Sequence, residues 1–144
     1  MTTLDVLEAR GPVPTGYRLT TAVGSFEFVR NGEDFDIAFG NFLDDWYHAE
    51  PDQRRLLVAD PIEMSPDDPL RKQAALLVAS IDWLCWVARP RMSPPAWLKD
   101  PVFTLPDPWF VVPGRSMRIW QLIESPAPFR MRRIFVDKNV VDRV

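Results

Sequence analysis

Apolar residues recur at helical spacing over much of the chain, most clearly after residue 32. Between residues 33 and 50 they are spaced i, i+4, i+7, i+8 and i+11, which lines up one apolar face: Phe35, Phe39, Phe42, Leu43 and Trp46. Three acidic residues in the first turn favour the positive end of the helix dipole. The pattern predicts a helix from near Glu33 that ends at Pro51, followed by a short helix over residues 52–59.

The longest apolar pattern covers residues 70–88. One stripe consists of Leu70, Ala74, Leu77, Ile81, Leu84 and Ala88, and a second consists of Leu76, Trp83 and Val87. A helix that is apolar on two sides is expected to be central, because neighbours must cover both flanks. The sequence Ser65-Pro66-Asp67-Asp68 predicts its start, with a serine cap and a proline in the first turn.

Prolines interrupt the pattern between residues 90 and 113. Since proline lacks an N–H and disfavours helix at the residue before it, we expect short turns and single-turn helices whose aromatic residues pack on the core. A further helix is predicted from Ser116 to Glu124. After Pro126 and Pro128 we expect a basic, extended tail.

Residues 17–32 show a different pattern. Apolar and polar residues alternate, and Gly24 and Asn31-Gly32 punctuate the alternation, which predicts one or two short strands and an N-terminal β-hairpin. Together the patterns predict a mainly α, single-domain helical bundle with proline-rich connections. We expect residues 1–32 to form a lead-in, and residues 33–144 a helical domain, within one globular unit.

Composition narrows the class of protein. The length, 144 residues, is that of one ordinary domain. No basic stretch followed by an apolar run begins the chain, and the longest apolar stretch is too short and too interrupted to span a bilayer, so we expect a cytoplasmic protein without membrane contact. The single cysteine, Cys85, lies between Trp83 and Trp86 and is expected to be buried and structural.

Charge is distributed unevenly. Residues 1–68 hold 14 acidic residues against 5 basic ones, whereas residues 115–144 hold 7 basic residues against 3 acidic ones. This polarity indicates either ion pairing inside the domain or a surface for a charged partner. Both interpretations stay open at this point.

Candidate chemistry is sparse. His48 follows Asp44 by four residues, the helical spacing that a metal pair or a carboxylate-oriented base requires. With Arg115 these residues form the candidate set for an unrecognised enzyme. His48 is the only histidine, and no second histidine or cysteine is available to complete a metal site. A solvated Asp–His pair explains the spacing better, so we expect no catalytic residue, no metal site and no cofactor.

Aromatic residues and arginines, which interface cores favour, gather in the last third of the chain. We expect a partner-binding surface made of Trp97, Trp109, Phe110, Arg115, Phe129, Arg130, Arg132 and Arg133. Arginines interleaved with aromatics can also contact nucleic acid. The sequence pI near 5.1 argues against that partner for this chain alone.

Several segments carry a family resemblance. They are Asn41–Tyr47, Pro94–Asp100, Pro108–Phe110, Glu124–Arg130 and Arg133–Val136. Over residues 35–144 the chain resembles a family of small uncharacterised proteins frequent in actinobacteria. It is also similar to the region that follows the helix-turn-helix in antitoxin-like regulators found beside nucleotidyltransferase-like proteins.

The resemblance implies a non-enzymatic protein-interaction module, an antitoxin-like or accessory partner of a nucleotidyltransferase-type protein encoded by a neighbouring gene. A DNA-binding transcriptional regulator and an unrecognised enzyme are the alternatives. The alternating pattern of residues 1–32 does not match the two amphipathic helices of a helix-turn-helix, which disfavours the regulator.

Overall fold

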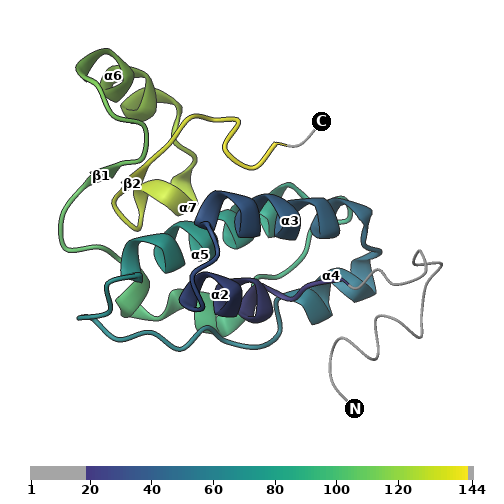
Figure 1. The fold of residues 1–144 in the computed structure, drawn as a ribbon. Helices are drawn as coiled ribbons and strands as arrows, with labels where there is room; N and C mark the ends of the chain where they lie inside the picture. The colour runs from purple at the N-terminus through teal and green to yellow at the C-terminus, as the bar shows by residue number, and fades with distance from the viewer. Residues whose placement is uncertain (1–18, 143–144) are drawn as a thin grey trace. The chain divides into compact units, whose positions relative to one another are not determined.

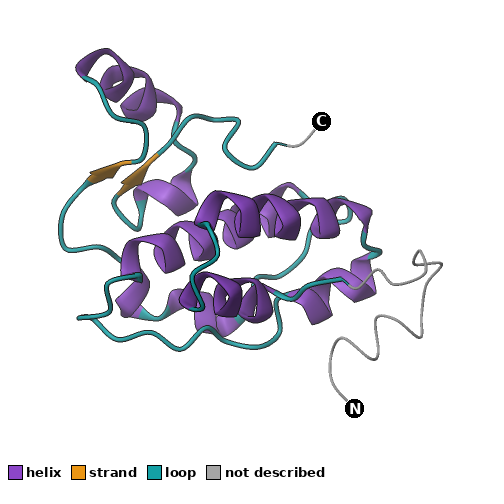
Figure 2. Ribbon diagram, in the orientation of Figure 1, coloured by secondary structure: helices purple, strands orange, loops and turns teal. Residues whose placement is uncertain are grey.

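The computed structural model describes residues 19–142, which belong to two compact units that meet between Ile62 and Glu63 (Figure 1). Helices dominate both units, and the strands of the described residues form one short pair in the second unit (Figure 2). The prediction of a mainly α fold is therefore confirmed. Among residues 19–142, no helix combines the length and the apolar character needed to cross a membrane.

The first unit contains α2 (Ala22–Arg30), α3 (Phe35–His48) and α4 (Pro51–Leu57). The expected helix at residue 33 is confirmed as α3: the carboxylate of Asp34 caps its first turn by accepting a hydrogen bond from the backbone N–H of Ile37 at 3.2 Å. The short helix predicted after Pro51 is confirmed as α4, with the proline at its first position. The predicted apolar face of α3 is buried at Phe39, Phe42, Leu43 and Trp46.

The predicted strands of residues 17–32 are wrong for the residues that the structure describes, and the part before residue 19 lies outside them. Residues 22–30 form α2, because the Thr21 hydroxyl caps it by accepting from the N–H of Gly24 at 3.0 Å. Its buried apolar residues are Ala22, Phe26 and Val29, at i, i+4 and i+7. A strand would place Phe26 and Phe28 on one face, but Phe26 is buried and Phe28 is 54% exposed. The helical spacing of apolar residues over the nine residues of α2 prevails over the alternation of apolar and polar residues that predicted strands.

Two polar contacts, one buried and one partly buried, connect elements of the first unit. The Ser25 hydroxyl on α2 donates to the backbone carbonyl of Ala38 on α3 at 3.0 Å. Farther along α3, the carboxylate of Asp45 accepts a hydrogen bond from the backbone N–H of Thr20 at 2.8 Å. The Ser25 bond joins α2 to α3, and the Thr20 bond joins the residues just before α2 to α3. Residues 22–30 accordingly belong to the same unit as α3, and the boundary between the units lies after Ile62.

The second unit is built on α5 (Arg71–Val87). Ser65 does not cap this helix, contrary to expectation: the turn at Asp68 precedes it, with the Asp68 carboxylate accepting from the N–H of Leu70 at 2.9 Å. Pro69 disfavours helix at the residue before it, so the helix begins only after the proline. The first predicted stripe is buried from Ala74 to Ala88, and the second is buried at its start and exposed at Val87.

Short 3₁₀ turns follow α5, as the prolines predict: η1 (Ala96–Lys99) and η2 (Pro101–Phe103). Leu98 and Phe103 are buried beneath them. Arg71 of α5 fastens this segment through its guanidinium, which donates to the backbone carbonyls of Val102 at 2.8 Å and Thr104 at 3.0 Å.

The remaining elements are β1 (Trp109–Phe110), α6 (Arg115–Glu124), α7 (Ala127–Arg130) and β2 (Ile134–Phe135). The strands pair in parallel, with Trp109 opposite Ile134, and the facing rings of Phe110 and Phe135 stack at 4.9 Å between centroids. The predicted helix at residues 116–124 is confirmed as α6. The predicted extended tail instead begins with the turn of α7, and only β2 is extended. In Figure 1, α6 stands clear of α5, with the strand pair between them.

The burial of α5 yields a stability prediction. Leu77 is 1% exposed, so Leu77→Asp buries an unpaired charge and is expected to lower the free energy of unfolding by about 4 kcal/mol. Val87→Asp on the same helix is the matched control, because Val87 is 39% exposed, and is expected to cost less than about 1 kcal/mol. Urea denaturation followed by circular dichroism measures both. Equal midpoints for the two variants would contradict the central position of α5.

Candidate protein-binding surface

Helix α6 is held in place by polar contacts. Its buried residue is Gln121, whose side-chain amide accepts from the backbone N–H of Val112 at 3.0 Å and donates to the carbonyls of Val112 at 2.9 Å and Met117 at 3.1 Å. Just beyond the helix, the Ser125 hydroxyl accepts from the N–H of Val136 at 2.8 Å. These bonds satisfy the buried amide and anchor α6 to the chain around β1 and β2.

The apolar side chains of α6 consequently face away from the rest of the second unit. Four of them are exposed: Ile119 (62%), Trp120 (58%), Leu122 (45%) and Ile123 (65%). Their spacing places them on one side of the helix, opposite Gln121, and we name this set the α6 face. A contiguous apolar group of this kind on a water-facing helix is typical of an interaction site, because monomers rarely leave one uncovered.

Arginines surround the α6 face, and we name them the arginine rim. Arg115 is exposed at the start of α6, and the guanidinium of Arg118 lies 5.3 Å from the centre of the Phe110 ring. At the other end, Arg130 donates to the carbonyl of Leu122 and, through Nε at 2.8 Å, to that of Ser125. The rim consists of Arg115, Arg118 and Arg130. It gives the surroundings of the α6 face a positive charge.

The structure places the predicted partner-binding residues in four different environments. Arg115 and Arg130 lie on the arginine rim. The aromatics Trp97, Trp109 and Phe110 are half-buried and engaged: Trp97 packs edge-on against Phe103 at 6.0 Å, Lys72 lies 5.8 Å from the Trp109 ring, and Phe110 stacks on Phe135. Arg133 is exposed, whereas Phe129 and Arg132 are buried.

The side chain of Arg132 bonds to groups inside the second unit. Its Nη1 lies 3.1 Å from the carboxylate of Asp82 and 2.8 Å from the carbonyl of Pro128, and its Nη2 donates to the carbonyl of Leu98 at 3.1 Å. Arg132 therefore cannot reach a partner in this structure. Arg132 thus forms one ion pair inside the second unit, and its partner Asp82 lies outside the acidic residues 1–68.

Arg133 is also committed to the backbone, although it is exposed. Its guanidinium donates to the carbonyl of Pro106 at 2.5 Å, and its own carbonyl accepts from the N–H of Trp109 at 2.9 Å. Its φ of 63° lies in the left-handed region, which a non-glycine residue adopts at a cost of roughly 1 kcal/mol or more. This conformation turns the chain into β2.

The sequence analysis predicted the helix at residues 116–124 but did not identify the α6 face, because periodicity alone does not tell which side of a helix packs inward. One signal was present. Polar Gln121 stands in the middle of the helix with apolar residues on both sides of it in the sequence. A buried glutamine that hydrogen-bonds a neighbouring segment reverses which side of the helix packs inward.

The candidate enzymatic residues belong to different units: Asp44 and His48 lie on α3 in the first unit. The His48 ring contacts the backbone carbonyl of Asp44, with Nδ1 at 2.7 Å, so Nδ1 is the donor in this bond. Arg115 belongs to the other unit. Within residues 19–142, no group of three or more His, Cys, Asp or Glu side chains is placed to hold a metal ion. Cys85 is buried as predicted, and burial, together with the charge of Asp82, raises the pKa of its thiol to about 11.

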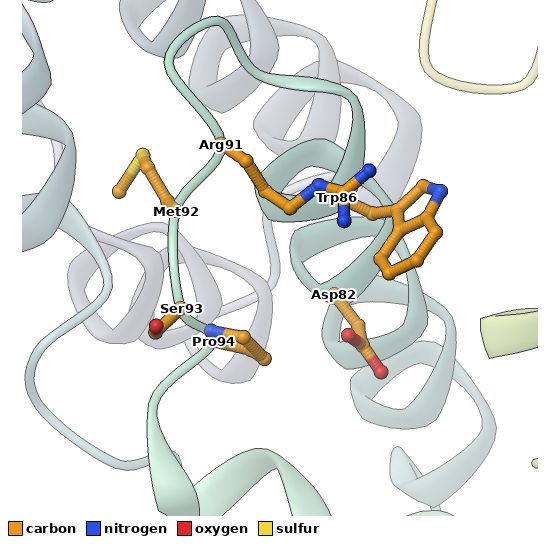
Figure 3. A pocket seen from close by; sticks show the side chains of 6 residues that line it. All are labelled: Asp82, Trp86, Arg91, Met92, Ser93 and Pro94. Atoms are coloured by element: carbon orange, nitrogen blue, oxygen red, sulfur yellow. The ribbon is translucent and has the colours of Figure 1, made fainter.

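A shallow hollow of about 250 Å³ lies between the end of α5 and the segment that follows it (Figure 3). Figure 3 shows Arg91 extended across Trp86, with the guanidinium carbon 3.9 Å from the ring centre, and Ser93 and Pro94 on the opposite wall. Asp82 also lines the hollow but is paired with Arg132. The volume falls below that of common small-molecule sites, and its two charged groups already have partners.

The first unit contains a smaller hollow of about 150 Å³, lined in part by Thr20 and Asn41. Asp45, four residues after Asn41 in the chain, has an unusual pKa. Burial raises the pKa of Asp45 to about 6, although the hydrogen bond from Thr20 and the charge of His48 act in the opposite direction. A buried acid with one backbone hydrogen bond is a local cost to folding at neutral pH.

Removal of Arg132 tests its internal role. Arg132→Ala leaves the Asp82 carboxylate and two backbone carbonyls without their donor, so we expect a loss of about 3 kcal/mol in the free energy of unfolding. Arg115→Ala, which removes an exposed guanidinium, is expected to change it by less than about 0.5 kcal/mol. Chemical denaturation of both variants gives the comparison. An Arg132→Ala protein as stable as wild type would contradict the assignment.

Asp45 yields a pH prediction. Its pKa of about 6 in the folded chain lies above the ordinary value of 3.8, so its contribution to stability is greatest below pH 4 and falls as the pH rises to about 6. Asp45→Asn stays neutral, so it is expected to exceed wild type in stability at pH 7 by up to about 3 kcal/mol and to match it near pH 4. Denaturation across this pH range measures the difference, and a constant difference would contradict it.

Comparison with known proteins adds no further constraint. No protein-family model, no curated protein and no solved structure matches the chain.

Proposed function

We propose that this chain is a non-enzymatic protein-binding module and that the α6 face is its binding surface. The observation that carries the proposal is the exposure of four apolar side chains on a helix whose buried side is polar. Covering a side chain of this size contributes about 1.5–3 kcal/mol. Water-exposed apolar area therefore supplies the driving force for association.

The anchoring of α6 suits this role. The hydrogen bonds of Gln121 and Ser125 hold α6 in the chain without a partner. Binding therefore does not incur the entropic cost of ordering this helix. Trp120 offers the large amphipathic ring that dominates binding energy in protein interfaces. A helix with apolar residues at i, i+3 and i+4 is the form that inserts into a groove of a partner.

The resemblance to antitoxin-like regulators supports a more specific proposal. We propose that the partner is a nucleotidyltransferase-type protein encoded by a neighbouring gene, and that this chain is its antitoxin-like or accessory subunit. The segment Glu124–Arg130, which carries part of the resemblance, runs from the end of α6 through α7 and ends at the arginine rim.

A DNA-binding role has weaker support. Helices α2 and α3 are joined by a four-residue turn that contains Gly32, so the first unit does contain a helix–turn–helix connection. The second helix of such a pair would have to enter the major groove with its N-terminal residues. Here that end carries the exposed acids Glu33, Asp34 and Asp36, which phosphate groups would repel.

Co-expression with the product of the adjacent gene tests the proposal. We expect a complex that survives purification, and we expect Trp120→Ser combined with Ile123→Ser to weaken it at least tenfold, because the apolar centre of the interface is lost. Ile37→Ser is the matched control, since Ile37 is as exposed as the α6 face but lies on α3. Isothermal titration calorimetry measures the affinities.

Two outcomes would contradict the proposal in different ways. The absence of any complex with the neighbouring gene product would contradict the antitoxin-like role. A complex whose affinity is unchanged by Trp120→Ser and Ile123→Ser would contradict the assignment of the α6 face.

A further inference from the structure

We infer that the α6 face binds an amphipathic helix whose apolar residues are flanked by Asp and Glu. This inference rests on the proposed function and specifies the chemistry of its partner. It follows from the charges around the face, since apolar area alone does not distinguish one partner from another.

The segment that carries the face is mostly positive, and its one acidic residue is Glu124 at the end of α6. Residues 109–136 contain five arginines and one glutamate. Arg132 is neutralised internally by Asp82, and Arg133 is bound to the carbonyl of Pro106. The arginine rim remains, and among the described residues Arg115 and Arg118 form neither an ion pair nor a hydrogen bond through their side chains.

The rim lies beside the apolar centre at both ends and along one edge. Arg115 is one helical turn before Ile119, and Arg118 is one turn before Leu122, so each arginine shares a side of α6 with an exposed apolar residue. At the C-terminal end, Arg130 is fixed by its bonds to the last carbonyls of α6. A partner that covers the apolar centre must therefore place acidic groups at these positions, or the positive charges of the guanidinium groups have no opposite charge beside them.

A second copy of the same helix fits poorly. In a two-fold antiparallel pair of α6 helices, the symmetry axis brings each edge of the helix against the same edge of its copy. The edge that carries Arg118 would then face itself, and like charges would oppose association. Acidic residues on the edge of a different helix remove this repulsion.

An anionic membrane surface fits less well than an acidic helix. The full chain has a net charge of −3, and 14 acidic residues stand against 5 basic ones in residues 1–68. A wide anionic surface repels the chain as a whole, whereas a helical partner meets only the arginine rim. The ten residues of α6 also offer a short apolar face compared with many interfacial helices.

The small size of the α6 face sets the expected strength. A contact centred on four side chains buries less than the roughly 1,200–2,000 Å² of stable complexes, so the helix contact alone is expected to be micromolar. In that regime, charge complementarity decides which helix binds and how fast.

Three synthetic 16-residue helical peptides test the inference with the full chain. They share one leucine stripe and carry Glu, Lys or Gln at the flanking positions. Fluorescence anisotropy of labelled peptides measures affinity, and the indole N–H resonance of Trp120 in NMR spectra reports the site. We expect the Glu peptide to bind about tenfold more tightly than the Gln peptide, with an affinity that falls as salt increases.

Charge reversal provides the matched variants. Arg115→Glu combined with Arg118→Glu is expected to reverse the preference, so that the Lys peptide binds at least tenfold more tightly than the Glu peptide. Arg55→Glu, at an exposed position on α4, is the control and should leave the preference unchanged. Circular dichroism verifies that each variant is folded.

Several results would overturn the inference. They are equal affinity for the three peptides, binding that leaves Trp120 unperturbed, binding of phosphatidylglycerol vesicles but of no peptide, and self-association by light scattering that Trp120→Ser abolishes. The experiments distinguish failure of this inference from failure of the proposed function. If Trp120→Ser and Ile123→Ser weaken the native complex but charge reversal does not, the α6 face binds a protein partner, and the inference that this partner is acidic is contradicted.

Discussion

Backbone carbonyl groups in and beside the short helical turns of the proline-rich segments are paired by arginine side chains, and the second unit depends on this pairing. Proline lacks an N–H and interrupts regular hydrogen bonding, yet buried carbonyls still need donors. Arg71 supplies them to Val102 and Thr104. Arg132 supplies them to Leu98 and Pro128. A guanidinium carries five N–H donors in a fixed plane, so a single side chain can join segments that share no ladder.

This constraint changes the meaning of the basic C-terminal region. In the sequence, an arginine cluster beside aromatic residues indicates a surface that binds nucleic acid or protein. In the structure its members have separate tasks: Arg132 is buried against Asp82, Arg133 holds the turn into β2, and Arg130 caps the end of α6 while remaining exposed. Arg115 and Arg118, beside the α6 face, remain exposed as well.

The same preference for polar anchoring explains the exposed α6 face. A helix normally docks through its apolar stripe, and its polar side meets water. Helix α6 docks through Gln121, whose amide satisfies both polar groups of Val112, and this bond fixes the rotation of the helix about its axis. Once that rotation is set, Trp120 and Ile123 must point outward. The apolar surface is thus built into the way the helix is attached.

The sequence by itself determined the elements whose burial and capping agree. Helix α3 was predictable because Asp34 caps it and its apolar residues share one side, and α5 because its stripe from Ala74 to Ala88 admits no other period. Buried Cys85 followed from its place on α5. In each case the local signals and the packing required the same structure.

Tertiary structure decided the rest, because it chose between local signals that conflicted. Thr21 and the contact of Ser25 with Ala38 made α2 a helix where a short alternation predicted strands. The roles of Arg132 and Arg133 depended on which acceptors lay near them, and Leu98, Pro106 and Asp82, at 27 to 50 positions away in the chain, are among those acceptors. The side of α6 that faces water depended on Gln121 meeting Val112. Periodicity reveals that a helix has two sides, but only the packing determines which of them is turned inward.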